Sequence, residues 1–406
     1  MPSRRHASTT AVLIATIALS SLPAVAQSPA APSAPASPAA GAAQAPVPPP
    51  ATVIVSPRVQ AGRVTIAYRA PSAKEVVLAM EGTPRLPMVR DEQGVWTATT
   101  PALAPDFYGY SIVVDGVGVL DPLNPVIKPN LLNPSSMVHI AGPSSGAGQL
   151  PWDPAAVPRG QLHRHFYRSA LVGDDRDYYV YTPPGYDARA ATAYPVLYLL
   201  HGFSDDASGW ISVGQVHVIL DNLIAQSKAR PMLVVMPLGY GAPEIVSRGP
   251  RTPAVWRRNI ERFKQTLLNE VVPAVERDYR TDARRERRAI AGLSMGGAES
   301  LFVGLNSLDR FAWIGAFSSG GLGQPGDLPE LFPTLDDSAN SRLSLLWIAC
   351  GTEDRLIEAN RHVRSWLTTK GVTHEDVDTP GGHTWMVWRR NLATFVPRLF
   401  VDRPIS

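Results

Sequence analysis

The strongest chemical signal in this chain is a serine set between glycines. Residues 292–297 read Gly-Leu-Ser-Met-Gly-Gly, with an apolar run at 288–291 before them and a helix-like run at 298–303 after them. A strand–turn–helix of this kind bends sharply at Ser294, and glycines on either side let strand and helix approach closely. The hydroxyl then projects beside a helix N-terminus, whose N–H groups can stabilise an oxyanion. These flanks favour a nucleophilic serine over a chance glycine–serine loop.

A serine nucleophile needs a general base and an acid that orients the base, and both residue types follow downstream. An apolar run over 343–349 precedes Glu353 and Asp354, which places the two acids at the expected carboxyl end of a strand. His383 follows two glycines after the strand-like run 374–378. The order serine, acid, histidine is that of α/β-hydrolases, not that of chymotrypsin or subtilisin. Spacing alone leaves both acids open as the partner of the histidine.

An early loop can supply the remaining oxyanion donor. The continuous apolar run 195–200 is typical of a parallel strand buried on both faces, and it ends in His201-Gly202-Phe203. A His-Gly step after this strand supplies a backbone N–H donor in α/β-hydrolases. We therefore expect the backbone N–H groups of Phe203 and Met295 to form the oxyanion hole. We expect His201 to hold the loop.

Several segments together resemble a known family. They are Arg-Asp-Tyr-Tyr-Val-Tyr-Thr-Pro-Pro-Gly-Tyr at 176–186, the run 194–202, and the runs 220–225, 236–237, 291–297 and 381–383. Over about residues 159–402 the chain resembles the feruloyl esterase branch of carbohydrate esterase family one, within the esterase D superfamily. The resemblance implies an α/β-hydrolase fold, ester hydrolysis through an acyl-enzyme on Ser294, and no cofactor. In that family the acid is the Asp of a Gly-Thr-x-Asp turn, so residues 351–354 favour Asp354 over Glu353.

The resemblance leads us to expect a serine esterase that removes ferulate or a related hydroxycinnamate from plant cell-wall polysaccharide, with feruloylated xylan or its oligosaccharides as partner. Two tryptophans after the histidine, Trp385 and Trp388, are candidates for an aromatic acyl pocket, although either could belong to the core. The alternatives are an acetyl-xylan or general carboxylesterase, a siderophore esterase of the enterochelin type, and a non-catalytic glycan-binding protein. The full set of serine, acid and histidine argues against the last of these.

The N-terminus has the order of a secretory signal. Two arginines precede an apolar run at 11–19, and Ala24-Val25-Ala26 follows. This pattern predicts a signal peptide over 1–26, and its apolar part is too short to span a membrane comfortably. We therefore expect an exported protein, periplasmic or extracellular, with no membrane attachment after cleavage. Residues 27–51 are almost entirely Ala, Pro, Ser, Gly and Gln, which predicts a disordered tether.

Composition excludes several classes of partner. The net charge is +3, and loss of residues 1–26 removes two arginines and no acid, which leaves +1 (3 − 2). A nearly neutral chain offers no electrostatic case for nucleic-acid binding. The single cysteine, Cys350, cannot form an intramolecular disulfide, and no His or Cys spacing indicates a metal site. The sequence does not indicate an oligomeric state.

Alternating apolar residues predict a small β-sandwich at 52–142, ahead of the catalytic region. Asp115-Gly116 is a hairpin signal within it. The motifs Phe-Tyr-Gly-Tyr, Val-Asp-Gly and Asp-Pro-Leu-Asn-Pro resemble the early-set, immunoglobulin-like module of carbohydrate-binding module family forty-eight. Its only tryptophan, Trp96, occupies a core position in such modules, so we do not expect glucan binding. A Pro/Gly/Ser joint at 143–158 follows.

The remaining residues, 159–406, alternate strand-like and helix-like runs, as a mostly parallel α/β sheet requires. Apolar residues between 216 and 223 share one helical face, and those between 260 and 275 share another, with Pro273 as a possible kink. The run 313–317 reads as the strand after the helix that follows Ser294. The predicted fold class is therefore α/β, an α/β-hydrolase sheet preceded by a β-sandwich.

Overall fold

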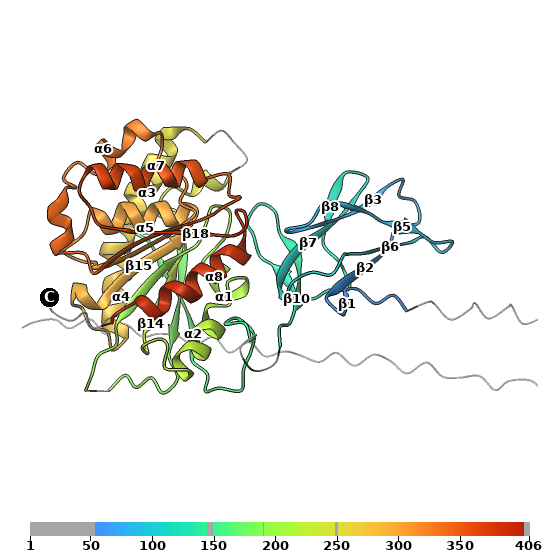
Figure 1. The fold of residues 1–406 in the computed structure, drawn as a ribbon, viewed down its shortest axis with the longest axis horizontal. Coiled ribbons are helices and arrows are strands. Elements are labelled where there is room, and N and C mark those ends of the chain that lie inside the picture. Colours follow the sequence, from blue (N-terminus) through green and yellow to red (C-terminus); the bar gives the residue numbers. More distant parts are fainter. Residues whose placement is uncertain (1–52, 144–145, 147–148, 190, 248–250, 402–406) are drawn as a thin grey trace, which may run out of the picture. The chain divides into compact units, whose positions relative to one another are not determined.

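The computed structural model describes residues 53–401, apart from 144–145, 147–148, 190 and 248–250 (Figure 1). The predicted signal peptide and tether lie outside the described residues. The chain from Val53 onward forms one compact unit that contains three sheets. No helix in the described ranges combines the length and the apolar character needed to cross a bilayer.

Two antiparallel sheets form the N-terminal part, which we call the β module (strands β1 to β10). The alternation expected from the sequence is present, because inward residues such as Val64, Ile66 and Leu78 are fully buried between the sheets. One sheet has the order β1 (Arg58–Gln60), β2 (Arg63–Arg69), β6 (Val95–Thr99), β5 (Val89–Arg90). The other has the order β4 (Leu86–Pro87), β3 (Val76–Met80), β7 (Asp106–Val114), β10 (Ser135–Ile140), β9 (Ile127–Lys128), with β8 (Val117–Val119) paired to β7.

The structure accounts for two features of the β module that the sequence indicated, the turn at Asp115-Gly116 and the position of Trp96. Asp115 and Gly116 both have positive φ, 46° and 86°, and they join β7 to β8 as the turn signal predicts. Trp96 is 8% exposed, and its indole N–H donates to Ala70 O at 2.8 Å. Its ring is therefore committed to the core of the module.

An eight-stranded sheet forms the C-terminal part, which we call the α/β domain. Its strand order is β11-β12-β14-β13-β15-β16-β17-β18, and all pairs from β14 to β18 are parallel. The predicted fold class is confirmed, with two antiparallel strands added at one edge. The bounds are β11 (Gln161–Arg168), β12 (Asp175–Thr182), β13 (Val196–Leu200), β14 (Leu233–Pro237), β15 (Arg288–Leu293), β16 (Trp313–Phe317), β17 (Leu345–Gly351) and β18 (Glu375–Thr379).

Helices cover both faces of this sheet (Figure 1), so its central strands are buried on both sides. One face packs against α1 (Gly209–Ser212), α2 (Val216–Ala225) and α8 (Trp385–Phe395). The other packs against α3 (Pro253–Thr266), α4 (Val272–Asp278), α5 (Met295–Leu305), α6 (Leu328–Leu331) and α7 (Ile357–Thr369). Short 3₁₀ turns lie at η1 (Pro243–Val246), η3 (Arg285–Arg287), η4 (Pro325–Asp327), η5 (Asp337–Ser341) and η6 (Val396–Arg398).

The helix expected around residues 260–275 is continuous but not uniform. A π-helical segment, η2 (Leu267–Val271), joins α3 to α4, and Pro273 is the second residue of α4. Proline has no N–H and its ring crowds the preceding turn, so a widened turn relieves the clash. The helix therefore carries its apolar face across this point, with Ile260 and Val275 in one core.

Buried polar contacts join the β module to α8. Arg389 and Asp106 are both fully buried, and Arg389 Nη2 donates to Asp106 Oδ1 at 2.6 Å. Arg389 also donates to Val213 O at 2.7 Å and to Phe107 O at 3.0 Å. Arg390 adds a second ion pair to Asp106 at 3.0 Å. The first residues of β7 are thus held on the helix that follows His383.

Candidate active site

Ser294 lies at the sharp turn between β15 and α5. Its φ of 52° and ψ of −114° are strained for a non-glycine residue. A methyl group on Gly292 would lie 2.5 Å from Gly296 O, and one on Gly296 would lie 2.5 Å from His201 O. Only glycine fits at these two positions. Ser294 N–H donates to Phe317 O at 2.8 Å, and Gly320 N–H donates to Ser294 O at 3.0 Å, so the neighbouring strand fixes the turn.

The structure brings Ser294, His383 and Asp354 together from three separate elements. His383 Nε2 lies 3.0 Å from Ser294 Oγ. Its other ring nitrogen, Nδ1, lies 2.8 Å and 3.0 Å from the two oxygens of Asp354. An Nδ1–H that donates to the carboxylate leaves Nε2 free to accept the serine proton. This arrangement can activate the serine hydroxyl for attack on a carbonyl carbon.

The two acids that the spacing left open have different surroundings. Asp354 is 2% exposed, and the side chain of Glu353 is exposed to solvent. Burial acts to raise the pKa of Asp354, but hydrogen bonds from His383 and from the N–H of Leu356 (2.8 Å) outweigh it and hold this pKa below its ordinary value. Asp354 is therefore an anion at neutral pH, as a partner of an imidazolium must be.

The loop after β13 packs directly against the serine. A methyl group on Gly202 would lie 2.5 Å from Leu293 Cδ1 and 3.4 Å from Ser294 Cβ. Phe203, the expected donor, follows it, and Met295 is the first residue of α5. His201 is 1% exposed, accepts at Nε2 from Gly239 N–H (2.9 Å), and bonds through Nδ1 to Gly202 O (2.8 Å). His201 thus ties the loop after β13 to the segment after β14.

Trp385 and Trp388 do not line an open pocket. They are 2% and 5% exposed, respectively, and Trp385 packs edge-on against Trp210. Trp388 meets His383 edge-on, with ring centroids 4.9 Å apart. Of the two alternatives that the sequence left open, an acyl pocket or the core, the structure favours the core, because both side chains lie on the face of α8 that packs against the sheet. Trp388 packs against the imidazole ring of His383.

A cavity lined by another tryptophan, Trp256, lies next to the segment that hydrogen-bonds to the serine turn, although Ser294 is not among its lining residues. It measures about 490 Å³ and lies between α3 and the loop after β16, with Trp256, Ile260, Gly321 and Leu322 among its lining residues. Gly321 directly follows Gly320, whose N–H reaches Ser294 O. The ring of Trp256 packs against Phe203 with centroids 5.7 Å apart. The sequence reasoning missed Trp256, since its only signal was a place on an amphipathic helix.

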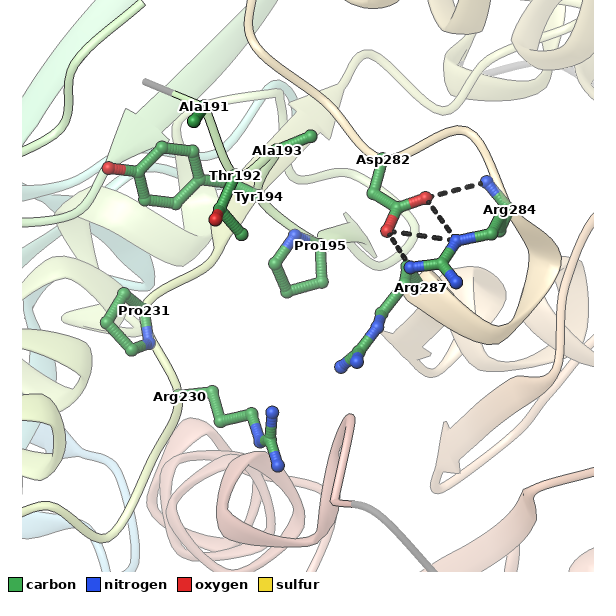
Figure 2. Close-up of a pocket in the computed structure, with 10 residues that line it drawn as sticks. All are labelled: Ala191, Thr192, Ala193, Tyr194, Pro195, Arg230, Pro231, Asp282, Arg284 and Arg287. Atoms are coloured by element: carbon green, nitrogen blue, oxygen red, sulfur yellow. Dashed lines mark hydrogen bonds and ion pairs between the residues drawn. The ribbon is translucent and has the colours of Figure 1, made fainter.

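A second cavity of about 560 Å³ lies at the other end of the parallel strands, away from Ser294 (Figure 2). Its lining includes Pro195 and Arg287, which directly precede β13 and β15, so it opens at the amino ends of the parallel strands. Figure 2 shows Asp282 paired with Arg284 on one wall and Arg230 across the cavity. Ser294, at the carboxyl ends, is not part of it. Among the described residues, no cluster of His, Cys, Asp or Glu is arranged to hold a metal ion.

A buried carboxyl group, Glu299, lies one helical turn after Met295. It is 1% exposed, and its Oε1 accepts from Asn259 Nδ2 at 3.1 Å. Burial raises the pKa of Glu299 well above its ordinary value. The sequence reasoning did not single it out, because the surrounding residues read simply as a helix.

Comparison with known proteins assigns the family. The model of the esterase family, described as "Putative esterase", matches residues 169–399, which is more than half of the chain. The chain belongs to this esterase family. It is a carboxylic ester hydrolase, and the site described above lies within the matched residues.

Curated relatives of the esterase share its sequence at moderate identity. It is 27% identical over 361 residues to an endo-1,4-beta-xylanase/feruloyl esterase of Xylanibacter ruminicola, covering 84% of this chain. The match spans 45% of that relative's length. An esterase of Mycobacterium tuberculosis is 26% identical over 358 residues, which covers 76% of this chain and 73% of the relative.

Solved structures support the fold. A ferulic acid esterase is 25% identical, with a TM-score of 0.51 over 59% of this chain and 97% of the other. The enterobactin esterase of Shigella flexneri, at 21% identity, has a TM-score of 0.60 over 82% of this chain and 92% of its own. At this identity the second likeness speaks for the fold alone.

Proposed function

We propose that this esterase hydrolyses feruloyl or related hydroxycinnamoyl esters of plant cell-wall polysaccharide, with Ser294 as nucleophile. The observation that carries the proposal is the hydrogen-bonded chain Ser294–His383–Asp354 beside a cavity walled by Trp256. The family assignment and the feruloyl esterases among the relatives support it. The cavity of about 490 Å³ has Trp256, Ile260 and Leu322 in its lining, together with polar side chains, and these apolar groups suit an aromatic acyl group.

The proposed reaction has two steps. Ser294 Oγ attacks the ester carbonyl carbon while His383 Nε2 takes the hydroxyl proton, and the C–O bond to the alcohol then breaks as His383 returns that proton to the leaving oxygen. Water, deprotonated by His383, then releases the acid and restores the serine. Asp354 keeps the imidazole in the required tautomer. The N–H groups of Phe203 and Met295 hold the oxyanion, at about 2.7–4 kcal/mol per donor.

The decisive test is a substrate panel on the full chain. An aromatic ring buried in the cavity removes roughly 100 Å² from water, and at about 25 cal/mol/Å² this amounts to some 2.5 kcal/mol. If that contact persists in the transition state, kcat/KM for methyl ferulate exceeds that for methyl acetate by about 50-fold, corrected for intrinsic reactivity. Equal values indicate a general or acetyl esterase, and preference for a catecholate ester indicates a siderophore esterase.

Ser294→Ala provides the control for that panel. The hydroxyl serves chemistry, so we expect turnover to vanish for every ester while the melting temperature stays within a few degrees of wild type. Turnover near that of wild type in this variant contradicts the site itself, whatever the preferred substrate.

We further propose export, on the basis of the signal-like N-terminus. Mass spectrometry of protein recovered from the periplasm or medium is expected to show Gln27 as the first residue. Recovery of the full-length chain in the membrane fraction contradicts this.

A further inference from the structure

The loop after β13 depends on contacts from outside itself. Ser204 in this loop has a φ of 69°, in the left-handed region that non-glycine residues rarely adopt. Within the α/β domain, Tyr240 Oη donates to Asp205 O at 2.7 Å, and His201 bonds to Gly202 O. These contacts fix one side of the loop. The other side faces the segment after β9 in the β module.

That segment contacts the loop through both backbone and side chain. Leu131 N–H donates to Ser204 O at 2.7 Å. Asn130 Nδ2 donates to Ser204 Oγ at 2.9 Å and to Asp205 Oδ1 at 3.1 Å. Three hydrogen bonds from two consecutive residues therefore span a sequence separation of more than 70 positions, onto the residues that directly follow Phe203.

The amide of Asn130 is fixed in this orientation by its own loop. Its Oδ1 accepts from the N–H groups of Leu132 (3.1 Å) and Asn133 (2.9 Å). The oxygen is thus committed to its own turn and the nitrogen faces the other loop. An Asn at this position has one orientation available, which makes it suited to positioning its partners.

Asp205 lies between Asn130 and the peptide of Gly202. Its carboxyl is 5% exposed, and burial raises its pKa to about 7. A methyl group on Gly202 would lie 3.6 Å from Asp205 Oδ2 and 3.4 Å from Ser294 Cβ, so the carboxyl packs beside the peptide that carries the Phe203 N–H. The buried Arg389–Asp106 pair holds the β module on α8, so the segment that carries Asn130 has a fixed base.

We propose that Asn130 is a positioning residue for ester hydrolysis, by which the β module holds Ser204 and Asp205 so that the Phe203 N–H points at the developing oxyanion. The proposal rests on the proposed roles of Ser294 and Phe203. It does not depend on which acyl group the esterase prefers. The β module then contributes to the chemistry itself, whether or not it also binds a glycan.

The test compares Asn130→Asp with Asn133→Asp in the full chain. The first replaces the Nδ2 donor by a carboxylate oxygen, which removes both donated hydrogen bonds and places a second carboxylate beside Asp205. The second adds the same charge to an exposed neighbour on the same turn. With p-nitrophenyl acetate, Asn130→Asp is expected to lower kcat about 10- to 100-fold and to leave KM within about twofold, since a misplaced oxyanion donor affects the transition state selectively. Asn133→Asp is expected to stay within twofold of wild type in both.

A transition-state analogue separates positioning from a merely structural role. A boronic acid that adds to Ser294 places an oxygen in the oxyanion hole, so its inhibition constant should rise by the factor by which kcat/KM falls. Inhibition by the free carboxylic acid product should change less than twofold. If Asn130→Asp does not accumulate as folded protein, Ser204→Ala, which removes only the Oγ acceptor, is measured in the same way, with an expected fall in kcat of about threefold or more.

A kcat for Asn130→Asp within twofold of wild type overturns the proposal, and so does a loss equal to that of Asn133→Asp. A lowered melting temperature with unchanged kcat and boronate affinity also overturns it. Failure of the proposed function is distinguishable, because in that case Ser294→Ala retains turnover.

Discussion

At the scale of single residues, the site separates two acidic side chains that differ by one position. Asp354 is buried and accepts hydrogen bonds from His383, and Glu353 extends into solvent. Consecutive side chains in this turn point in different directions, so only Asp354 contacts the imidazole of His383. The different environments of the two acids can be tested by substitution.

We expect Asp354→Asn to reduce kcat by about 10⁴-fold and Glu353→Gln to change it less than twofold. An amide opposite Nδ1 favours the wrong histidine tautomer, and the reference loss for such a change is about 10⁴. Steady-state rates with methyl ferulate, taken at equal concentrations of folded protein, provide the measurement. A crippled Glu353→Gln variant would show that the acid is misassigned.

The buried carboxyl group of Glu299 is expected to make the stability of the folded protein depend on pH. Its pKa is raised in the folded state, so the native protein holds this proton above pH 4.5, where the unfolded chain releases it. Its contribution therefore falls as the pH rises from about 4.5 through the folded pKa. Glu299→Gln removes this dependence while keeping the donor–acceptor shape.

The measurement for Glu299 is the melting temperature of wild type and Glu299→Gln at pH 5, 7 and 9. We expect the variant to gain relative to wild type as the pH increases. Exposed Glu358→Gln serves as the matched control, with no such trend. A constant difference across this range contradicts burial of a titrating carboxyl group at Glu299.

At the scale of elements, the sequence predicted those turns and loops whose conformation depends on neighbouring residues. The turn at Ser294 and the Gly-rich loop at His383 are specified by neighbouring residues, so their positions could be predicted from the sequence. β17 begins at Leu345 and not at 343, because an apolar run does not show where hydrogen bonding to the adjacent strand starts. Trp256 contacts Phe203, and Asn130 contacts Ser204 and Asp205. These partners are distant in sequence, and no local pattern predicts such pairings.

The two tryptophans of α8 show why residue type alone is insufficient. Trp385 and Trp388 follow His383 closely, yet the rotation of α8 places both rings in the core. Trp256 on α3 has the same ring but is only partly buried, and it faces the cavity beside Ser294. The direction of a helix face, which depends on tertiary packing, therefore decides whether a tryptophan packs into the core or lines a cavity.

We accordingly expect Trp256→Ala to lower kcat/KM for methyl ferulate about 10- to 50-fold and to leave methyl acetate within twofold, because only the aromatic acyl group loses a buried contact. The matched control is Trp366→Ala, which removes a partly buried tryptophan of α7 that packs against Phe332. Equal losses for both esters in Trp256→Ala would show that this cavity does not hold the acyl group.

At the scale of the whole molecule, the β module and the α/β domain share buried polar contacts. The sequence indicated two domains with a joint between them, but it did not show that Asp106 of β7 meets Arg389 of α8, 283 positions away. The likeness of the β module to the early-set group stays a prediction, with Trp96 in its core. The β module contacts α8 through Asp106 and the loop that carries Phe203 through Asn130 and Leu131.

The buried pair makes the final prediction. Because Arg389 and Asp106 have no exposed side-chain surface, Asp106→Ala leaves a buried cation without its counter-charge, which typically costs 3–5 kcal/mol. We expect a marked fall in the free energy of unfolding, measured by urea denaturation, and a single cooperative transition for the wild type by both tryptophan fluorescence and circular dichroism. Asp175→Ala, which removes an exposed pair with Arg168, is expected to cost less than about 1 kcal/mol. Two separate transitions in the wild type, or equal losses in the two variants, would mean that the β module folds independently of α8. Asn130 would then lack the fixed base that the proposal for the loop carrying Phe203 requires.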